Sequence, residues 1–194
     1  MAAPPGAAFQ TSQMNAPYPD APDAVLHFWR AERANWFSHD PAFDRRFRER
    51  FALLHRQAAS GKLSHWQGSA PGCLALLILL DQYPRNAFRG APRMYATDAQ
   101  ALAIARAALA AGHWDAAGDL KLFLCLPFAH SENPADQERS VALNSRLGPP
   151  WLSHAEGHRD IIRRFGRFPH RNRILGRSST PDEIAFLRDG GFAG

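Results

Sequence analysis

The segment DPAFDRRFRERFALLHRQAASG, residues 40–61, carries a full set of signals for a single helix. Asp40 is a good N-cap residue, and Pro41 falls in the first turn, where its missing N–H costs nothing. Gly61 can end the helix. Four apolar side chains repeat at helical spacing on one face: Phe43, Phe47, Phe51 and Leu54. The segment predicts an amphipathic helix over 41–59 with its phenylalanine face buried.

Similar capping and spacing signals recur on both sides of this segment. No stretch shows sustained period-2 alternation bounded by hairpin turns, so strands are not expected. The sequence therefore predicts an all-α protein, one domain over 23–194 with about eight helices in antiparallel hairpins, as a bundle or a short solenoid. The other expected helices cover about 23–35, 71–82, 97–111, 117–125, 133–147, 153–165 and 180–189, and two of their expected N-caps are Thr97 or Asp98 and Ser153.

The helix expected over 71–82 contains the apolar block CLALLILL and should be the central buried one. We expect it to end before Pro84, which disfavours helix at the preceding residue. Asp81 then lies in the last turn, at the negative end of the helix dipole, and needs a cationic or donor partner. It is either half of a buried Asp–Arg clasp or a carboxylate of a functional site.

The remaining composition points to an ordinary globular chain of 194 residues with a net charge of +5. Residues 1–22 are rich in Ala, Pro and polar residues and are predicted to be a disordered tail. No apolar run is long enough to span a membrane, and no secretory signal is visible, so we expect a cytoplasmic protein without a membrane partner. Cys73 and Cys125 lie in apolar runs and are expected to be buried free thiols.

A basic segment, HAEGHRDIIRRFGRFPHRNRILGRSST at residues 154–180, holds seven arginines and three histidines against two carboxylates. Three interpretations stay open. The segment could bind a small phosphate- or carboxylate-bearing ligand through Arg167, Arg171 and His170, which a Gly166/Pro169 bend would present. Its arginines could serve only the fold by bridging carboxylates and helix ends. A nucleic-acid face, with phenylalanines stacking on bases, is the least favoured.

Metal and nucleophile chemistry find little support in the residue spacing. His154 and His158 are four residues apart, as in a two-histidine metal pair, but Glu156 does not follow the first histidine directly. Adjacent residues such as His130, Ser131 and Glu132 rarely point at one another, so they do not form a catalytic triad. We expect no metal and no cofactor. His130 and His158 are the candidate general bases if the protein is an enzyme.

Several motifs resemble a bacterial family known as domain of unknown function 924. They are DQYPRN at 81–86, FRG at 88–90, LPFAHSE at 126–132, H-x-x-x-I-x-R-F-G-R-F-P-H-R-N at 158–172 and LGRSST at 175–180. The resemblance spans about residues 23–192. It implies an all-helical fold similar to tetratricopeptide-repeat (TPR) proteins, and it implies no established activity. Lys121 stands where we expect the family to favour arginine.

The polar signature of that family falls on and next to the loops after the third, fifth and seventh expected helices. We therefore predict a site formed by these three loops that binds a small anionic ligand. The alternatives are a TPR-like interaction module for a peptide or protein, and binding of nucleic acid. The candidate ligand-binding residues are Asp81, Arg85, Asn86, Glu132, Arg164, Arg167, His170, Arg171, Asn172 and Arg177; Arg89, His130, Gln137 and His158 complete the signature.

Overall fold

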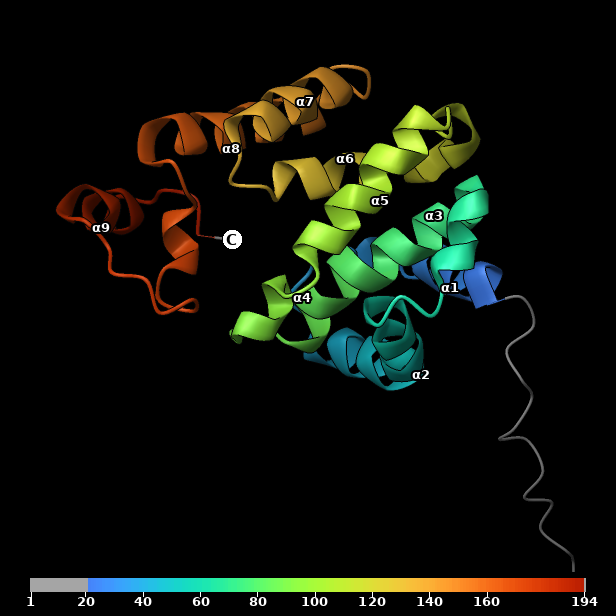
Figure 1. Cartoon of the computed structure of the whole chain (residues 1–194). Coiled ribbons are helices and arrows are strands. Elements are labelled where there is room, and N and C mark those ends of the chain that lie inside the picture. Colours follow the sequence, from blue (N-terminus) through green and yellow to red (C-terminus); the bar gives the residue numbers. More distant parts are fainter. Residues whose placement is uncertain (1–20, 194) are drawn as a thin grey trace, which may run out of the picture.

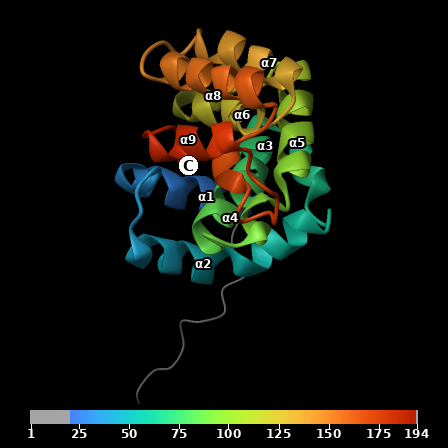
Figure 2. The ribbon, with the colours of Figure 1, turned by 90° about the vertical axis from the view of Figure 1, so that its left-hand side faces the viewer.

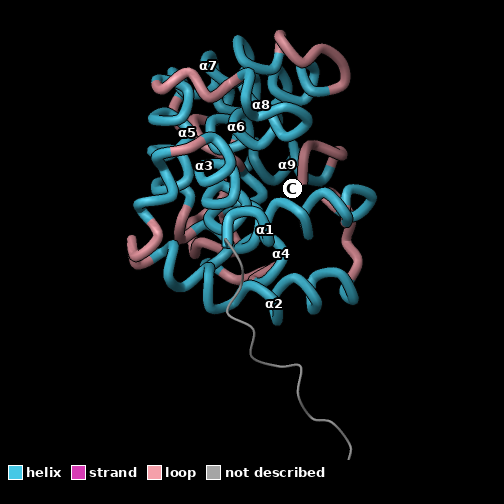
Figure 3. The backbone as a smooth tube through the Cα atoms, turned by 90° about the vertical axis from the view of Figure 1, so that its right-hand side faces the viewer, coloured by secondary structure: helices cyan, strands magenta, loops and turns pink. Residues whose placement is uncertain are grey.

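The computed structural model describes residues 21–193, which form helices and loops and include no strand (Figures 1 and 3). The predicted all-α class is confirmed. The predicted N-terminal tail lies outside the described residues, except for Ala21 and Pro22, which begin the first helix. The α-helices are α1 (Ala21–Ala31), α2 (Pro41–Ala59), α3 (Ala70–Leu77), α4 (Tyr83–Ala87), α5 (Asp98–Ala110), α6 (Lys121–Ala129), α7 (Pro134–Asn144), α8 (Trp151–Phe165) and α9 (Pro181–Arg188).

Helix starts follow the local capping chemistry where a cap residue precedes proline. The side chains of Asp40 and Asn133 each accept a hydrogen bond from the N–H two residues later. Thr180 and Glu183 form a complete capping box at the start of α9. The predicted cap at Ser153 is wrong: α8 begins at Trp151, and the Ser153 hydroxyl donates to a carbonyl instead.

In the main core, α1 packs against α3, and the buried face of α2 packs against α4 and the turn before it (Ile78–Gln82). Helix α3 is buried nearly all round, as its unbroken apolar sequence predicts. Phe43, Phe47 and Phe51 of α2 are fully buried, and the rings of Phe28 and Trp29 of α1 pack against them. Both cysteines are free and buried, as predicted: Cys73 in α3 and Cys125 in α6.

From α5 to α8, each helix packs against the next one in the chain. Helix α5 contacts α3 and α6, and α6, α7 and α8 stack in sequence at one end (Figures 1 and 2). Helix α9 and the loop before it lie along one side, in front of α6 (Figure 2). The superhelical arrangement of a TPR protein stays a prediction. No described helix is long and apolar enough to cross a membrane.

The central helix does not end at Gln82, so that prediction is wrong. Helix α3 continues through a π-helical turn (Ile78–Gln82) directly into α4, and Pro84 lies in the first turn of α4. Within this turn the Tyr83 N–H bonds to the carbonyl five residues earlier. Proline has no N–H for the Leu80 carbonyl, so this oxygen needs another donor.

Side chains from two other helices satisfy the carbonyls that the π turn leaves open. The Thr97 hydroxyl donates to the Leu80 carbonyl, and Nδ1 of His55 lies 2.9 Å from the Leu79 carbonyl oxygen. Thr97 precedes α5 but makes no capping bond there, contrary to its expected role. The chain thus passes proline without leaving the helix because tertiary contacts replace the missing backbone donors.

Candidate functional site

The π turn and α4 place an aspartate and an arginine in the protein interior. Asp81 is 1% exposed, and Nη1 of Arg85 lies 3.1 Å from its carboxylate. Arg85 also grips Asp98 at the start of α5 with both terminal nitrogens, at 2.9 and 3.0 Å. Burial raises the pKa of Asp81, but the charge of Arg85 and contacts with His130 and Gln82 outweigh it and lower the pKa, so the carboxylate stays ionised. Arg85 therefore forms a clasp between two helices.

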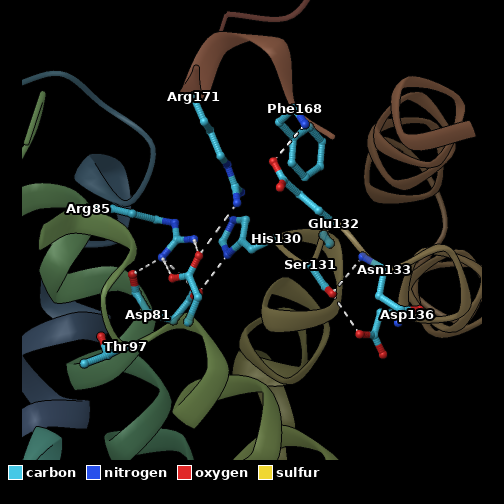
Figure 4. Close-up of polar contacts among 12 residues, drawn as sticks. Asp81, Arg85, Thr97, His130, Ser131, Glu132, Asn133, Asp136, Phe168 and Arg171 are labelled. Carbon is cyan, nitrogen blue, oxygen red and sulfur yellow. Dashed lines mark hydrogen bonds and ion pairs between the residues drawn. The ribbon is translucent and has the colours of Figure 1, made fainter. Parts of the chain in front are cut away.

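His130 meets this clasp from the C-terminal end of α6. Its Nδ1 lies 2.7 Å from Oδ1 of Asp81, and burial lowers the pKa of the imidazole (Figure 4). Because the carboxylate is ionised and accepts, we infer that Nδ1 carries the proton and that Nε2 has a free lone pair. Gln137 of α7 holds the end of α6 in place by donating to the carbonyls of Phe128, Ala129 and Ser131.

Glu132, two residues later, anchors the segment that follows α8. Its carboxylate accepts the Phe168 N–H at 2.9 Å and both terminal nitrogens of Arg177, at 2.7 and 3.0 Å. Hydrogen bonds from these partners lower the pKa of Glu132 against the opposing effect of burial. Arg177 also donates to Asn172, which is fully buried. These contacts fix the loop between α8 and α9.

Glu183 of α9 anchors the same loop from the other side. Nε and Nη2 of Arg167 donate to its two oxygens at 2.6 and 2.8 Å, and Asn172 donates to it at 3.1 Å. The hydrogen bonds from Arg167 lower the pKa of Glu183 to about 2. Arg167 and Arg177 are therefore both occupied by carboxylates, and they form a frame around the residues between them.

Arg171 lies inside that frame with a different environment. It is 7% exposed, and its side chain points toward Arg85 (Figure 4). The guanidinium carbon lies 4.5 Å from the centre of the Phe168 ring and 4.7 Å from that of Tyr95. Its one ion pair among the described residues is a 3.9 Å contact with Asp98, which Arg85 already holds. Nε of Arg171 is buried and has no hydrogen-bond partner within residues 21–193.

Two histidines close to Arg171 share this lack of partners. Nδ1 of His158 and Nδ1 of His170 are both buried, and neither has a hydrogen bond to any residue that the structure describes. Each imidazole packs against the rings of Phe168 and Phe192, with ring centres 4.7 to 5.6 Å apart. Burial and nearby positive groups, Arg171 among them, lower the pKa of His158 to about 3 and that of His170 to about 4. Both rings are neutral at pH 7.

The remaining predicted site residues lie away from Arg171. Asn86 donates to the Gln82 carbonyl and accepts from Arg89, so it serves the π turn. Arg164 lies over the ring of Phe165, and with Arg167 it lines a surface depression of about 470 Å³ that shares no residue with the Arg171 cluster. The structure thus brings together Asp81, Arg85, His130, His158, His170 and Arg171, and it separates Arg164 and Arg167 from them.

Four residues of this cluster were not predicted from sequence. Asp98 resembled a helix cap, and Tyr95 lies in a short turn with no pattern around it. Thr97 was also expected to be a cap. Phe192 lies beyond the last predicted helix. No local signal distinguishes these residues, because each acts through partners that are distant in sequence.

The described part of the chain holds neither a metal-binding group nor a reactive thiol. Within residues 21–193, no three His, Cys, Asp or Glu side chains are grouped so that they could hold a metal ion. The ring of His154 packs against Trp151, whereas that of His158 packs against Phe168 and Phe192. Burial raises the pKa of Cys125 to about 12 and also raises that of Cys73, so neither is a thiolate at neutral pH.

The sequence profile of the family described as bacterial protein of unknown function (DUF924) matches residues 25–191. The protein belongs to this family. The chain is also similar to the solved structure of ATU0120, a protein of unknown function from Agrobacterium tumefaciens. The two share 48% sequence identity and a TM-score of 0.85, over 87% of this chain and 97% of that one. A comparison with curated proteins gave no match.

Proposed function

We propose that this DUF924 protein binds a small anionic ligand, bearing a phosphate or carboxylate, at Arg171. The observation that carries the proposal is the contrast among the arginines. Arg85, Arg167 and Arg177 each grip a carboxylate with two nitrogens, whereas Arg171 is buried with Nε unpartnered and one long ion pair. A buried charge without a full partner is costly, so a site that keeps one is suited to a ligand of opposite charge.

The histidines extend the same argument. His158 and His170 each carry a buried ring nitrogen that no described residue binds. A neutral imidazole N–H donates to an anion, and a protonated one does so more strongly. Because an anion stabilises the protonated form, ligand binding should raise the low pKa values of these rings. Affinity should therefore increase as the pH falls from 7 toward 5.

The other two interpretations have less support. Four arginines of the 154–180 segment already pair with carboxylates: Arg159 with Asp160, Arg163 with Glu138, Arg167 with Glu183 and Arg177 with Glu132. An open phosphate-binding face needs such groups free. A peptide groove needs contiguous exposed apolar side chains. The large exposed ones come from separate elements of the described chain: Phe37, Leu53, Leu175, Ile184 and Phe192.

The test is a thermal-shift and calorimetric screen of phosphate esters, inorganic phosphate and mono- and dicarboxylates against three proteins. These are the wild type, Arg171→Met and the control Arg163→Met, which removes an exposed arginine paired with Glu138. A ligand at about 100 times its dissociation constant should stabilise the wild type and the control by about 2.7 kcal/mol. Arg171→Met should lose this gain. Equal stabilisation of all three proteins, or of none, would contradict the proposal.

A second candidate function is general-base catalysis on the bound anion by His130. The hydrogen bond from Nδ1 to Asp81 fixes the tautomer and leaves Nε2 as a base, which is the orientation that such catalysis needs. His158 is a weaker candidate because no carboxylate orients its ring. Proton NMR of candidate ligands in D₂O tests this role through exchange of their carbon-bound protons. His130→Gln should abolish the exchange and keep the binding; unchanged exchange would assign the base elsewhere.

A further inference from the structure

Phe192 occupies a position between the two unpartnered histidines. Its ring centre lies 4.7 Å from that of His158 and 5.1 Å from that of His170, with interplanar angles of 60° and 83°. Edge-to-face contacts of this kind are a favourable arrangement for aromatic rings. The ring completes a cluster in which each imidazole touches both Phe192 and Phe168. The position therefore accepts a flat six-membered ring.

Phe192 is also weakly held. It follows α9 on a short non-helical segment that Gly190 begins with a φ of +85°. The Gly191 N–H donates to the Phe186 carbonyl, and no backbone hydrogen bond among the described residues holds Phe192 itself. Its side chain is 42% exposed, whereas Phe168 on the other side of the imidazoles is 1% exposed. One of the two phenylalanines is thus fixed in the core, and the other can leave.

The buried nitrogens of His158, His170 and Arg171 lack hydrogen-bond partners among the described residues, and Phe192 cannot supply one. A hydrocarbon ring does not accept a normal hydrogen bond from an imidazole N–H or from Nε of Arg171. The Arg171 guanidinium touches Phe168, the same ring that touches both histidines, so the cation and the aromatic position are continuous. A ligand with both an aromatic ring and an acidic group would fill the position and satisfy the buried nitrogens together.

We propose that the ligand of the Arg171 site is a small aromatic acid whose ring displaces Phe192 from between His158 and His170. This proposal rests on the proposed anion binding and narrows its ligand class. The acidic group, carboxylate or phosphate, faces Arg171 and the imidazole nitrogens. Phe192 acts in the free protein as an internal substitute for the ring, and it competes with the ligand for the same place.

Two matched pairs of probes test the ligand class by calorimetry: phenyl phosphate against methyl phosphate, and phenylacetate against acetate. The phenyl member of each pair should bind at least about tenfold more tightly to the wild type, because it adds the burial of a ring. Whichever pair binds more tightly identifies the acidic group. Equal affinity within both pairs would overturn the aromatic class and leave anion binding intact. If no probe binds to either the wild type or Phe192→Ala, both the aromatic ligand class and the proposed anion binding are overturned.

The variant Phe192→Ala tests the competition. Removing the competing ring should increase the affinity for phenyl phosphate or phenylacetate several-fold. In this variant the ligand no longer has to displace Phe192 from the site. The control Ile184→Ala, an exposed apolar residue of α9, should leave affinity unchanged. A loss of affinity in Phe192→Ala would show that the ring is a wall of the site that contacts the ligand, and would overturn its displacement. Circular dichroism of both variants verifies that they fold.

Discussion

The guanidinium of Arg171 lies 4.7 Å from the centre of the Tyr95 ring, with the ring of Phe168 at a similar distance. Aromatic faces attract a cation, but they do not satisfy its N–H donors. Arg171 is thus held in position by rings, while Nε is left without an acceptor. This distinguishes it from its neighbour Arg85, whose donors are taken by Asp81 and Asp98.

The first prediction follows from that contrast. Arg171→Met should leave the free energy of unfolding unchanged or raise it, because the substitution removes a buried charge with an incomplete partner. Arg85→Met should lower it by about 3–5 kcal/mol, since two carboxylates lose their shared cation. Urea unfolding measures both. A loss of several kcal/mol in Arg171→Met would mean that this arginine serves the fold.

A second prediction concerns acid. The folded-state pKa values of His158 and His170, about 3 and about 4, lie below the unfolded value near 6.5. The unfolded chain therefore binds more protons between those values, and stability falls as the pH decreases from about 6.5 to about 4. Each histidine contributes a slope of at most about 1.4 kcal/mol per pH unit.

Single-residue variants test whether His158 and His170 cause this dependence of the unfolding free energy on pH. His158→Phe and His170→Phe should each flatten the dependence of the unfolding free energy on pH, measured by urea titration from pH 7.5 to pH 4. The exposed His65 is the control, and His65→Gln should keep the wild-type profile. An unchanged profile in both phenylalanine variants would mean that other groups cause the acid sensitivity.

The third prediction concerns the π turn. Thr97→Val removes the donor to the Leu80 carbonyl, which Pro84 leaves open, and should cost about 1–3 kcal/mol of unfolding free energy. Thr97→Ser keeps a hydroxyl and should cost less. Chemical denaturation of the two variants makes the comparison. A larger loss in Thr97→Ser than in Thr97→Val would show that the methyl group of Thr97, and not its hydroxyl, stabilises the turn.

The fourth prediction is that both thiols are unreactive in the folded protein. Burial raises the pKa of Cys125 to about 12 and raises that of Cys73, so the thiolate fraction at pH 7.5 is very small. Ellman's reagent should modify neither cysteine without denaturant and both in 6 M guanidinium chloride (roughly a fully unfolding concentration). Rapid labelling of one thiol in native buffer would contradict its described burial.

Much of the helical framework could be read from local sequence. The pairs Asp40–Pro41, Asn133–Pro134 and Thr180–Pro181 each begin a helix where predicted, because a cap satisfies N–H groups two or three residues away. The prediction failed at Pro84, where Thr97 and His55 supply hydrogen bonds from other helices. Predicting the end of a helix from proline alone assumes that no distant side chain replaces the backbone N–H donor that proline lacks.

The candidate site, like the fold, could be predicted from the sequence only in part. The sequence alone established that residues 154–180 concentrate arginine and histidine among phenylalanines, and that a carboxylate, Asp81, follows the apolar block of the central helix. Only the tertiary structure decided that Glu132 and Glu183 occupy Arg177 and Arg167 while Arg171 is left between rings. Partners 16 and 45 residues apart leave no local pattern. Which charge is neutralised depends on where the packed helices bring its partner, and that is a property of the whole fold.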